Sequence, residues 1–169
     1  IRDYYLMRYK DISDMGDYIT KVYMNSNFVN SKIAYKDVAY FTDELANYTG
    51  TVYANGKVYG TVDNLASDEI TIKTNDTTYC EGKFSIKGMP DMDHAELYFK
   101  TDKLISNLSD AKKLLINVDQ KEISSLLPNE LGELGTFSFS GYYQGRLNDF
   151  NLKGQMQSAI GGIYADFNM

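Results

Sequence analysis

The chain has 169 residues, which is enough for one domain with a substantial core. The apolar fraction of 43% and the charged fraction of 24% are ordinary for a folded domain. The net charge is −6 and no basic cluster stands out, which disfavours nucleic acid and anionic membrane surfaces as partners. The single cysteine, Cys80, excludes an intrachain disulfide.

The first third of the chain gives mixed local signals. Residues 1–9 alternate loosely and predict a strand. Residues 11–24 fit either a helix or a strand, because apolar residues at helical spacing overlap a run that could be extended. The Asn- and Ser-rich residues 25–32 predict a turn.

Three short helices are predicted. The first covers 37–46, where Asp37 can cap and the apolar residues fall on one face. The second covers 120–127, capped by Asp119 and stopped by Pro128. A further short helix is predicted within 104–115, with Ser109 as its cap. Because these helices are short, each is expected to cover one end of a sheet.

From residue 48 onward the pattern is dominated by strands. The pair Asn55-Gly56, between runs 51–54 and 57–62, is the strongest hairpin signal in the chain. Strict alternation predicts further strands with one apolar and one polar face. These cover 69–74, 80–87, 96–100, 136–140, 152–156 and 159–169.

The apolar residues of the alternating strands are predicted to line one continuous concave surface. The periodicity leaves open whether this surface is an open trough or a closed core. The candidate lipid-facing or core residues are Ile70, Ile72, Cys80, Phe84, Ile86, Leu97, Phe99, Phe137, Phe139, Leu152, Met156, Ile163 and Phe167.

The segments 56–65 and 141–150 resemble each other, which predicts tandem repeats of about 85 residues. Each segment has Gly, three residues, Gly, one residue, an aliphatic residue, an Asp/Asn pair and an apolar residue. Glycines recurring inside strands indicate a sharply curved sheet. We therefore expect 1–30 to be the tail of a preceding repeat, 31–116 a first unit and 117–169 an incomplete second unit, all within one continuous β structure.

Motifs for catalysis or metal binding are weak. Asp91 to Glu96, with the sole histidine His94, is the one cluster of candidate ligands, but it lacks the frame of a Ca²⁺ loop and the several His/Cys ligands of a zinc site. No nucleophile elbow or phosphate loop occurs. Cys80 alternates as the inward residue of a strand and is expected to be a small buried hydrophobe. We therefore expect no enzyme, no catalytic residue, no metal and no cofactor.

A family resemblance rests on three segments: Ser31 to Phe41, then the Gly56-x3-Gly60-x-Val-Asp-Asn-Leu motif, then Phe84 to Asp91. The segments 139–150 and 159–161 repeat the pattern. Together they resemble the TamB/AsmA-like envelope proteins, above all the very long forms of Bacteroidetes-type Gram-negative bacteria. The resemblance covers most of 31–169 and implies a curled, mostly antiparallel sheet, a β-taco or open-barrel-like fold made of tandem repeats with short capping helices.

The resemblance also implies a function in envelope biogenesis, as a translocation and assembly module. It implies a non-catalytic periplasmic segment of an inner-membrane-anchored protein that supports phospholipid transport to the outer membrane, or outer-membrane assembly, through its apolar sheet face. Because the chain begins with Ile1 and shows neither signal peptide nor membrane span, we expect the anchor to lie outside it. One alternative is a scaffold that binds outer-membrane β-barrel precursors by strand addition. Another is an extracytoplasmic glycan-processing enzyme, which the dispersed carboxylates and missing Trp disfavour.

Overall fold

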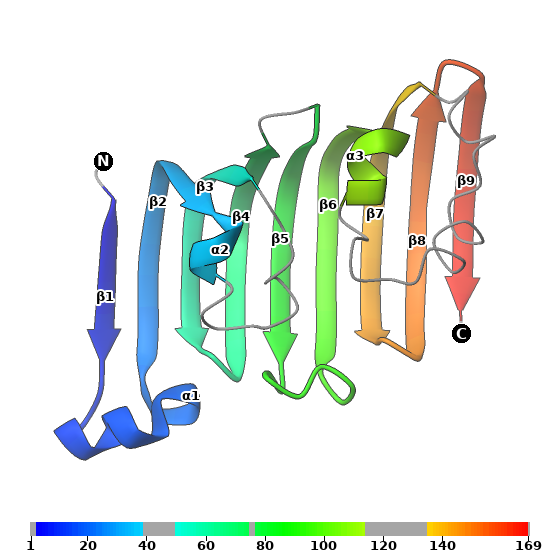
Figure 1. The fold of residues 1–169 in the computed structure, drawn as a ribbon. Helices are drawn as coiled ribbons and strands as arrows, with labels where there is room; N and C mark the ends of the chain where they lie inside the picture. The colour runs from blue at the N-terminus through cyan, green and yellow to red at the C-terminus, as the bar shows by residue number, and fades with distance from the viewer. Residues whose placement is uncertain (1–2, 39–49, 75–76, 114–134, 169) are drawn as a thin grey trace.

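The protein is a single open sheet of nine antiparallel strands in sequence order, β1 to β9, as the computed structural model shows (Figure 1). The structure describes residues 3–38, 50–74, 77–113 and 135–168. The sheet is curled but not closed into a barrel, and among the described residues β1 and β9 are its first and last strands (Figure 1). The mainly β, curled antiparallel fold with short helices expected from the sequence is confirmed.

Each strand pairs with its neighbours in the chain, so the topology is a meander. The strands are β1 (Tyr4–Arg8), β2 (Tyr23–Ala34), β3 (Thr51–Thr61), β4 (Asn64–Thr74), β5 (Tyr79–Lys87), β6 (Glu96–Asn107), β7 (Thr136–Arg146), β8 (Asp149–Ser158) and β9 (Gly161–Asn168). Two-residue turns join β3 to β4, β7 to β8 and β8 to β9.

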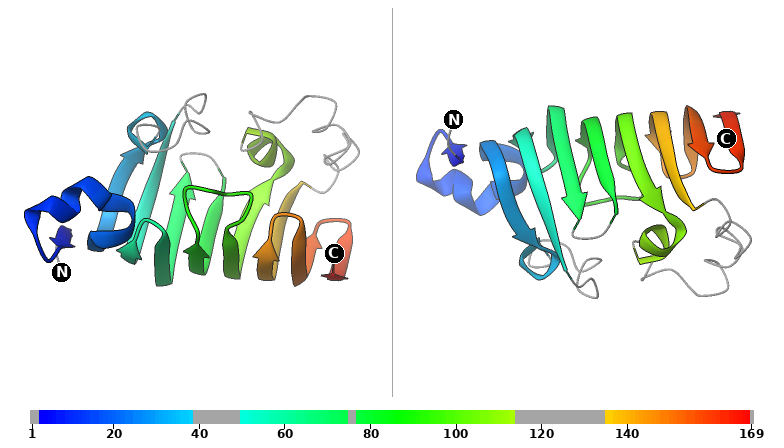
Figure 2. Two further views of the ribbon diagram at one scale, coloured as in Figure 1. Left: turned by 90° about the horizontal axis from the view of Figure 1, so that it is seen from below. Right: turned by 90° about the horizontal axis from the view of Figure 1, so that it is seen from above.

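The described helices are short and lie between strands. They are the 3₁₀ helix η1 (Ile12–Asp17), α1 (Tyr18–Lys21), α2 (Tyr35–Val38) and α3 (Leu108–Lys113). Figure 2 shows α2 and α3 on the same side of the sheet. The helical reading of 11–24 is therefore right up to Lys21, and the strand reading holds from Tyr23. Of the helix expected over 37–46, α2 covers the start, while 39–46 and the whole of 120–127 lie outside the described residues.

The turn expected over 25–32 is wrong, since these residues belong to β2. The polar residues there build a bulge, and Asn30 adopts the left-handed φ of 51° that Asn tolerates better than most residues. The Asn30 backbone N–H donates to the Asn55 side chain at 2.7 Å, and the Val29 N–H donates to Asp3. Side chains of neighbouring segments thus accept hydrogen bonds from backbone N–H groups at the bulge.

The hairpin expected at Asn55-Gly56 is also wrong, because β3 runs straight through it. Gly56 lies at a bulge between β3 and β4, and the Asn55 side-chain oxygen accepts a hydrogen bond from the Asn30 backbone N–H in β2. The turn falls instead at Val62 and Asp63. The Asp63 N–H donates to the Ile19 carbonyl at 3.1 Å and the Asp63 carbonyl accepts from Gly88 at 2.7 Å, so tertiary hydrogen bonds hold this turn.

The helix expected within 104–115 forms only over 108–113, since 104–107 extend β6. Its cap is Asn107, not Ser109. The Asn107 side-chain oxygen accepts from the Asp110 backbone N–H at 2.8 Å. Asn107 therefore ends the strand and begins the helix in one step, because its side chain satisfies a donor that the first helical turn leaves free.

The two glycine-containing segments were expected to match at Gly56 and Gly141 and at Gly60 and Gly145. The first pair differs, since Gly56 lies at a bulge with a φ of 127° and Gly141 pairs with Gly154 without a bulge. The second pair occupies equivalent hairpins. Gly60 lies opposite Leu65 and Gly145 opposite Phe150, each one pair before a two-residue turn. Both have positive φ, 120° and 138°. A Cβ at either position would meet the carbonyl oxygen of the residue that follows the turn, Asn64 or Asp149. The close approach of the next strand thus requires glycine in both hairpins.

The equivalence extends to the preceding strand and helix. β6 has the same length as β2, and α3 follows β6 directly as α2 follows β2. The hairpin of β7 and β8 then corresponds to that of β3 and β4, but it begins further along the chain from α3 than β3 does from α2. The order strand, helix, hairpin therefore recurs, with a longer connection after α3. The boundary expected between residues 30 and 31 falls inside β2.

Candidate functional site: the apolar face of the sheet

The strand register places all thirteen candidate residues on one face of the sheet, since directly opposed residues point to the same side. One unbroken row of opposed residues crosses six strands: Ile72, Cys80, Leu104, Phe139, Met156 and Ile163. A second row holds Phe84, Phe99, Tyr143, Leu152 and Phe167. Ile70, Ile86, Leu97 and Phe137 lie in neighbouring rows of this apolar face.

The register adds members that sequence reasoning missed, among them Leu65, Leu104, Tyr143 and Phe150. Leu104 was missed because a bulge between Thr101 and Leu104 shifts the alternation of β6 by one residue. Without the bulge, period two would place Leu104 on the polar face. Phe150 could have been found, since it occupies the motif position of Leu65 in the earlier hairpin.

Five aromatic rings form a ladder, four of them in the second row and Phe150 in the neighbouring row. Phe84, Phe99 and Tyr143 follow one another with ring centroids 6.4 Å apart, and Phe150 and Phe167 continue at 4.8 and 5.8 Å. Ring pairs at such separations add about 0.5–1.5 kcal/mol each beyond area burial. The ladder spans β5 to β9, so it ties together the C-terminal half of the sheet.

Small residues lie between the aromatic ladder and the first row. The Phe139 ring lies over Gly141 and Gly154, where a Cβ at either glycine would meet ring atoms. Gly141 and Gly154 are directly opposed, and Ala165 follows them in β9. The small residues thus make room for the Phe139 ring, which fills the space above Gly141 and Gly154.

The helical segments cover only parts of this face. At the N-terminal edge, the Tyr18 hydroxyl lies 2.6 Å from the Tyr5 hydroxyl and 3.2 Å from the Met24 sulfur. Tyr5 and Met24 both point to the apolar face by register, so α1 packs there. At the opposite strand ends, Asp110 of α3 accepts from the Thr77 backbone N–H at 2.9 Å.

The rest of the face is half-buried for the most part, Leu97 is buried, and exposure is greatest in β9 and at Phe99. The relative exposure of Phe99 is 36%, that of Phe167 48% and that of Ile163 59%. The accessible surface of the chain is 11221 Å². A compact monomer of 19.2 kDa is expected to expose about 8,400 Å². Among the described residues no second sheet lies against this one, which accounts for part of the excess.

Cys80 lies in the first row, opposite Ile72 and Leu104. Burial among these side chains raises the pKa of its thiol. A thiol with a raised pKa is a poor nucleophile at neutral pH. Burial likewise raises the pKa of Tyr143 in the ladder. Both effects indicate an apolar environment along the rows.

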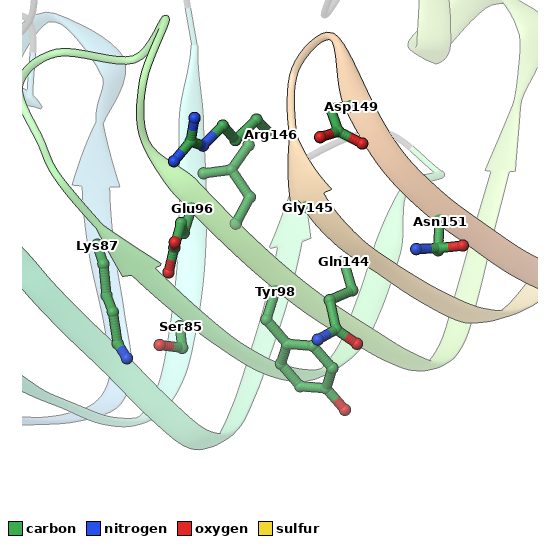
Figure 3. Close-up of a pocket in the computed structure, with 10 residues that line it drawn as sticks. Ser85, Lys87, Glu96, Tyr98, Gln144, Gly145, Arg146, Asp149 and Asn151 are labelled. Atoms are coloured by element: carbon green, nitrogen blue, oxygen red, sulfur yellow. The ribbon is translucent and has the colours of Figure 1, made fainter. Parts of the chain in front are cut away.

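The opposite face carries a polar groove of about 820 Å³ across β5 to β8 (Figure 3). Apart from Leu97 and Gly145, the residues that line it are charged or polar: Ser85, Lys87, Glu96, Tyr98, Gln144, Arg146, Asp149 and Asn151. Within the described part of the chain, none of the four charged side chains forms an ion pair. Two positive and two negative charges balance, so the groove has no strong preference for an anion or a cation.

His94 lies in the connection between β5 and β6, with its Nδ1 atom 2.8 Å from Asp91 and most of its side chain exposed. This contact lowers the pKa of the Asp91 carboxyl. In the ranges that the structure describes, no three His, Cys, Asp or Glu residues are grouped to hold a metal ion. No helix among the described residues combines the length and apolarity that crossing a membrane requires.

The fold and the apolar face define this chain as a mainly β protein with an open, one-layer antiparallel sheet. Comparison with protein-family models, with curated proteins and with solved structures finds no match.

Proposed function

We propose that this chain binds the hydrocarbon chains of phospholipid along its apolar face. In this proposal it is a non-catalytic, periplasmic segment of an inner-membrane-anchored TamB/AsmA-like protein, and it supports phospholipid transport to the outer membrane or outer-membrane assembly. The motif resemblance motivates the family and the location. The open apolar face motivates the ligand.

The observation that carries the proposal is an apolar face that continues across strands and is partly exposed among the described residues. Its rows cross β4 to β9 without an opposed charged residue. Large exposed apolar patches are rare on soluble monomers and mark sites of binding. Burying a large apolar side chain is worth roughly 1.5–3 kcal/mol, so covering this face is strongly favourable.

The chemistry of the face suits an acyl chain better than a compact apolar ligand. The ladder and the first row are long and parallel to each other across the sheet, which gives an extended apolar strip. Among the described residues the strip has few hydrogen-bonding side chains: the Tyr143 hydroxyl, which donates to the Arg146 carbonyl, and the hydroxyls of Thr101 and Ser67. An acyl chain needs no hydrogen-bonding groups to orient it.

Site-specific photo-crosslinking tests the proposal. A photoreactive phenylalanine at Phe84 or Phe99 is incubated with vesicles of phosphatidylethanolamine, irradiated and analysed by mass spectrometry. Matched controls replace the neighbouring Lys83 or Lys100, whose side chains point to the opposite face. We expect lipid adducts at the two phenylalanine positions and not at the lysine positions. Equal labelling of both faces, or none on either, rules out the lipid-binding face.

A further inference from the structure

The polar groove on the face opposite the apolar rows has no part in the proposed lipid binding. It crosses β5 to β8, and each of these strands is paired with a neighbour on both sides. All the residues that line it belong to the described part of the chain. Its volume of about 820 Å³ falls within the range of about 300–1,000 Å³ that is typical of small-ligand sites. The groove is therefore large enough to hold a ligand of that size.

A row of uncharged hydrogen-bonding side chains lines the groove (Figure 3). Ser85, Tyr98, Gln144 and Asn151 are directly opposed in turn from β5 to β8. Among the described residues, the side-chain amides of Gln144 and Asn151 have no hydrogen-bond partner. A side-chain amide both donates and accepts hydrogen bonds, as a sugar hydroxyl does. The half-buried Tyr98 adds an aromatic ring, on whose face the C–H groups of a pyranose ring can stack.

A row of charged side chains lies beside the uncharged row. Lys87 is directly opposite Glu96, and Arg146 is directly opposite Asp149. The signs therefore alternate from β5 to β8, and all four side chains are exposed. Because none of them forms an ion pair among the described residues, the carboxylates can accept hydrogen bonds from hydroxyl groups and the two cations can donate to them.

We propose that this groove binds a neutral oligosaccharide. The closely spaced hydroxyls of such a ligand match the donors and acceptors of both rows, and its ring faces match the Tyr98 ring. The balanced charges of the groove give an uncharged ligand no electrostatic penalty. This inference does not depend on lipid binding, because the groove and the apolar rows lie on opposite faces of the sheet.

Other occupants fit the groove less well. Single-stranded nucleic acid binds in a positively charged groove, which Glu96 and Asp149 prevent here. An extended peptide adds to an unpaired strand edge, whereas β5 to β8 are paired on both sides. A zwitterionic phospholipid head group would find both signs of charge, but its acyl chains would then lie on the polar face.

An NMR titration of the isotope-labelled whole chain, without lipid, tests the proposal. The chain is titrated separately with cellohexaose, maltohexaose and chitohexaose. We expect at least one of these sugars to shift the side-chain amide signals of Gln144 and Asn151. The amide signal of Gln157, which is exposed on the same face outside the groove, should stay unchanged. Because the ligand is neutral, added salt should not weaken binding.

Single substitutions then locate the site. Gln144→Ala and Asn151→Ala should each weaken binding about two- to tenfold, because hydrogen bonds to the sugar are lost. Gln157→Ala is the matched control and should bind like the unchanged chain, and circular dichroism confirms that each variant folds. An absence of shifts at Gln144 and Asn151 with all three sugars overturns the proposal, as does an equal loss of binding in Gln157→Ala. Tighter binding of glycerophosphoethanolamine than of any of the sugars also overturns it, and would assign the groove to a zwitterionic head group.

Discussion

Replacing Gly60 or Gly145 by alanine perturbs the curl of the sheet at its two equivalent hairpins. Both glycines have positive φ, and an added Cβ would fall on the carbonyl oxygen of Asn64 or Asp149. Forcing a residue with a side chain into such a conformation costs about 1–3 kcal/mol. Moving the neighbouring strand to relieve the clash would also weaken a ladder hydrogen bond, worth about 0.5–1.5 kcal/mol.

The two contributions together predict a loss of about 2–4 kcal/mol for Gly60→Ala and a similar loss for Gly145→Ala. In a chain of this size each kcal/mol lowers the melting temperature by about 2–4 °C. Thermal melts followed by circular dichroism should therefore show a decrease of about 5–15 °C for each variant.

Gly16→Ala is the matched control. Gly16 lies in η1, its φ is not in the left-handed region, and a Cβ there meets nothing within 4 Å. Its effect should stay within about 0.5 kcal/mol. If Gly60→Ala and Gly145→Ala melt like Gly16→Ala, close strand approach does not explain these glycines. If only one of the two destabilises the protein, the hairpins are not equivalent.

Two further predictions concern single side chains. Asn107→Ala should lower the free energy of unfolding, measured in urea, by about 0.5–2 kcal/mol because the α3 cap is lost. Ser109→Ala should leave this free energy nearly unchanged. A larger loss for Ser109→Ala than for Asn107→Ala would contradict the capping geometry. Because burial raises the pKa of its thiol, Cys80 should react with iodoacetamide at pH 7.5 more slowly in the native chain than in urea. As the pH is raised, the reaction rate of the native chain should still be increasing where that of the unfolded chain has levelled off. Equal pH profiles would show that the thiol is not buried. The same raised pKa means that the thiol favours folding below its unfolded pKa of about 8.5, and that this contribution is lost as the pH rises above that value.

The alternation of apolar and polar residues was enough to predict the β fold and the side of the sheet on which each candidate falls. This works because each strand has one face that is apolar, and a one-residue slip would expose the whole set. Glycine spacing also predicted that segments 56–65 and 141–150 match, which holds for Gly60 and Gly145 but not for Gly56 and Gly141. The local pattern therefore contains most of the information on the apolar face.

The errors arose where tertiary contacts override local preference. Asn55-Gly56 is a strong turn signal on its own, but the Asn55 side chain binds the Asn30 backbone of the neighbouring strand. The Asn- and Ser-rich part of β2 is likewise satisfied from both sides by Asp3 and Asn55. Bulges could not be located from the sequence, and one of them hid Leu104. Pairing partners that are distant in the sequence decide these features.

The most direct test of the central claim compares isoleucine methyl groups on the two faces by NMR, with stearic acid spin-labelled at its chain end as the probe. Ile70, Ile72 and Ile86 lie on the apolar face, while Ile105 lies on the opposite face between Tyr79 and Ser138. All four are half-buried, so their access to solvent is comparable. Binding along the apolar face predicts strong broadening of the first three signals and little change at Ile105. Equal broadening of all four, or none, would contradict a hydrocarbon-binding face on this sheet.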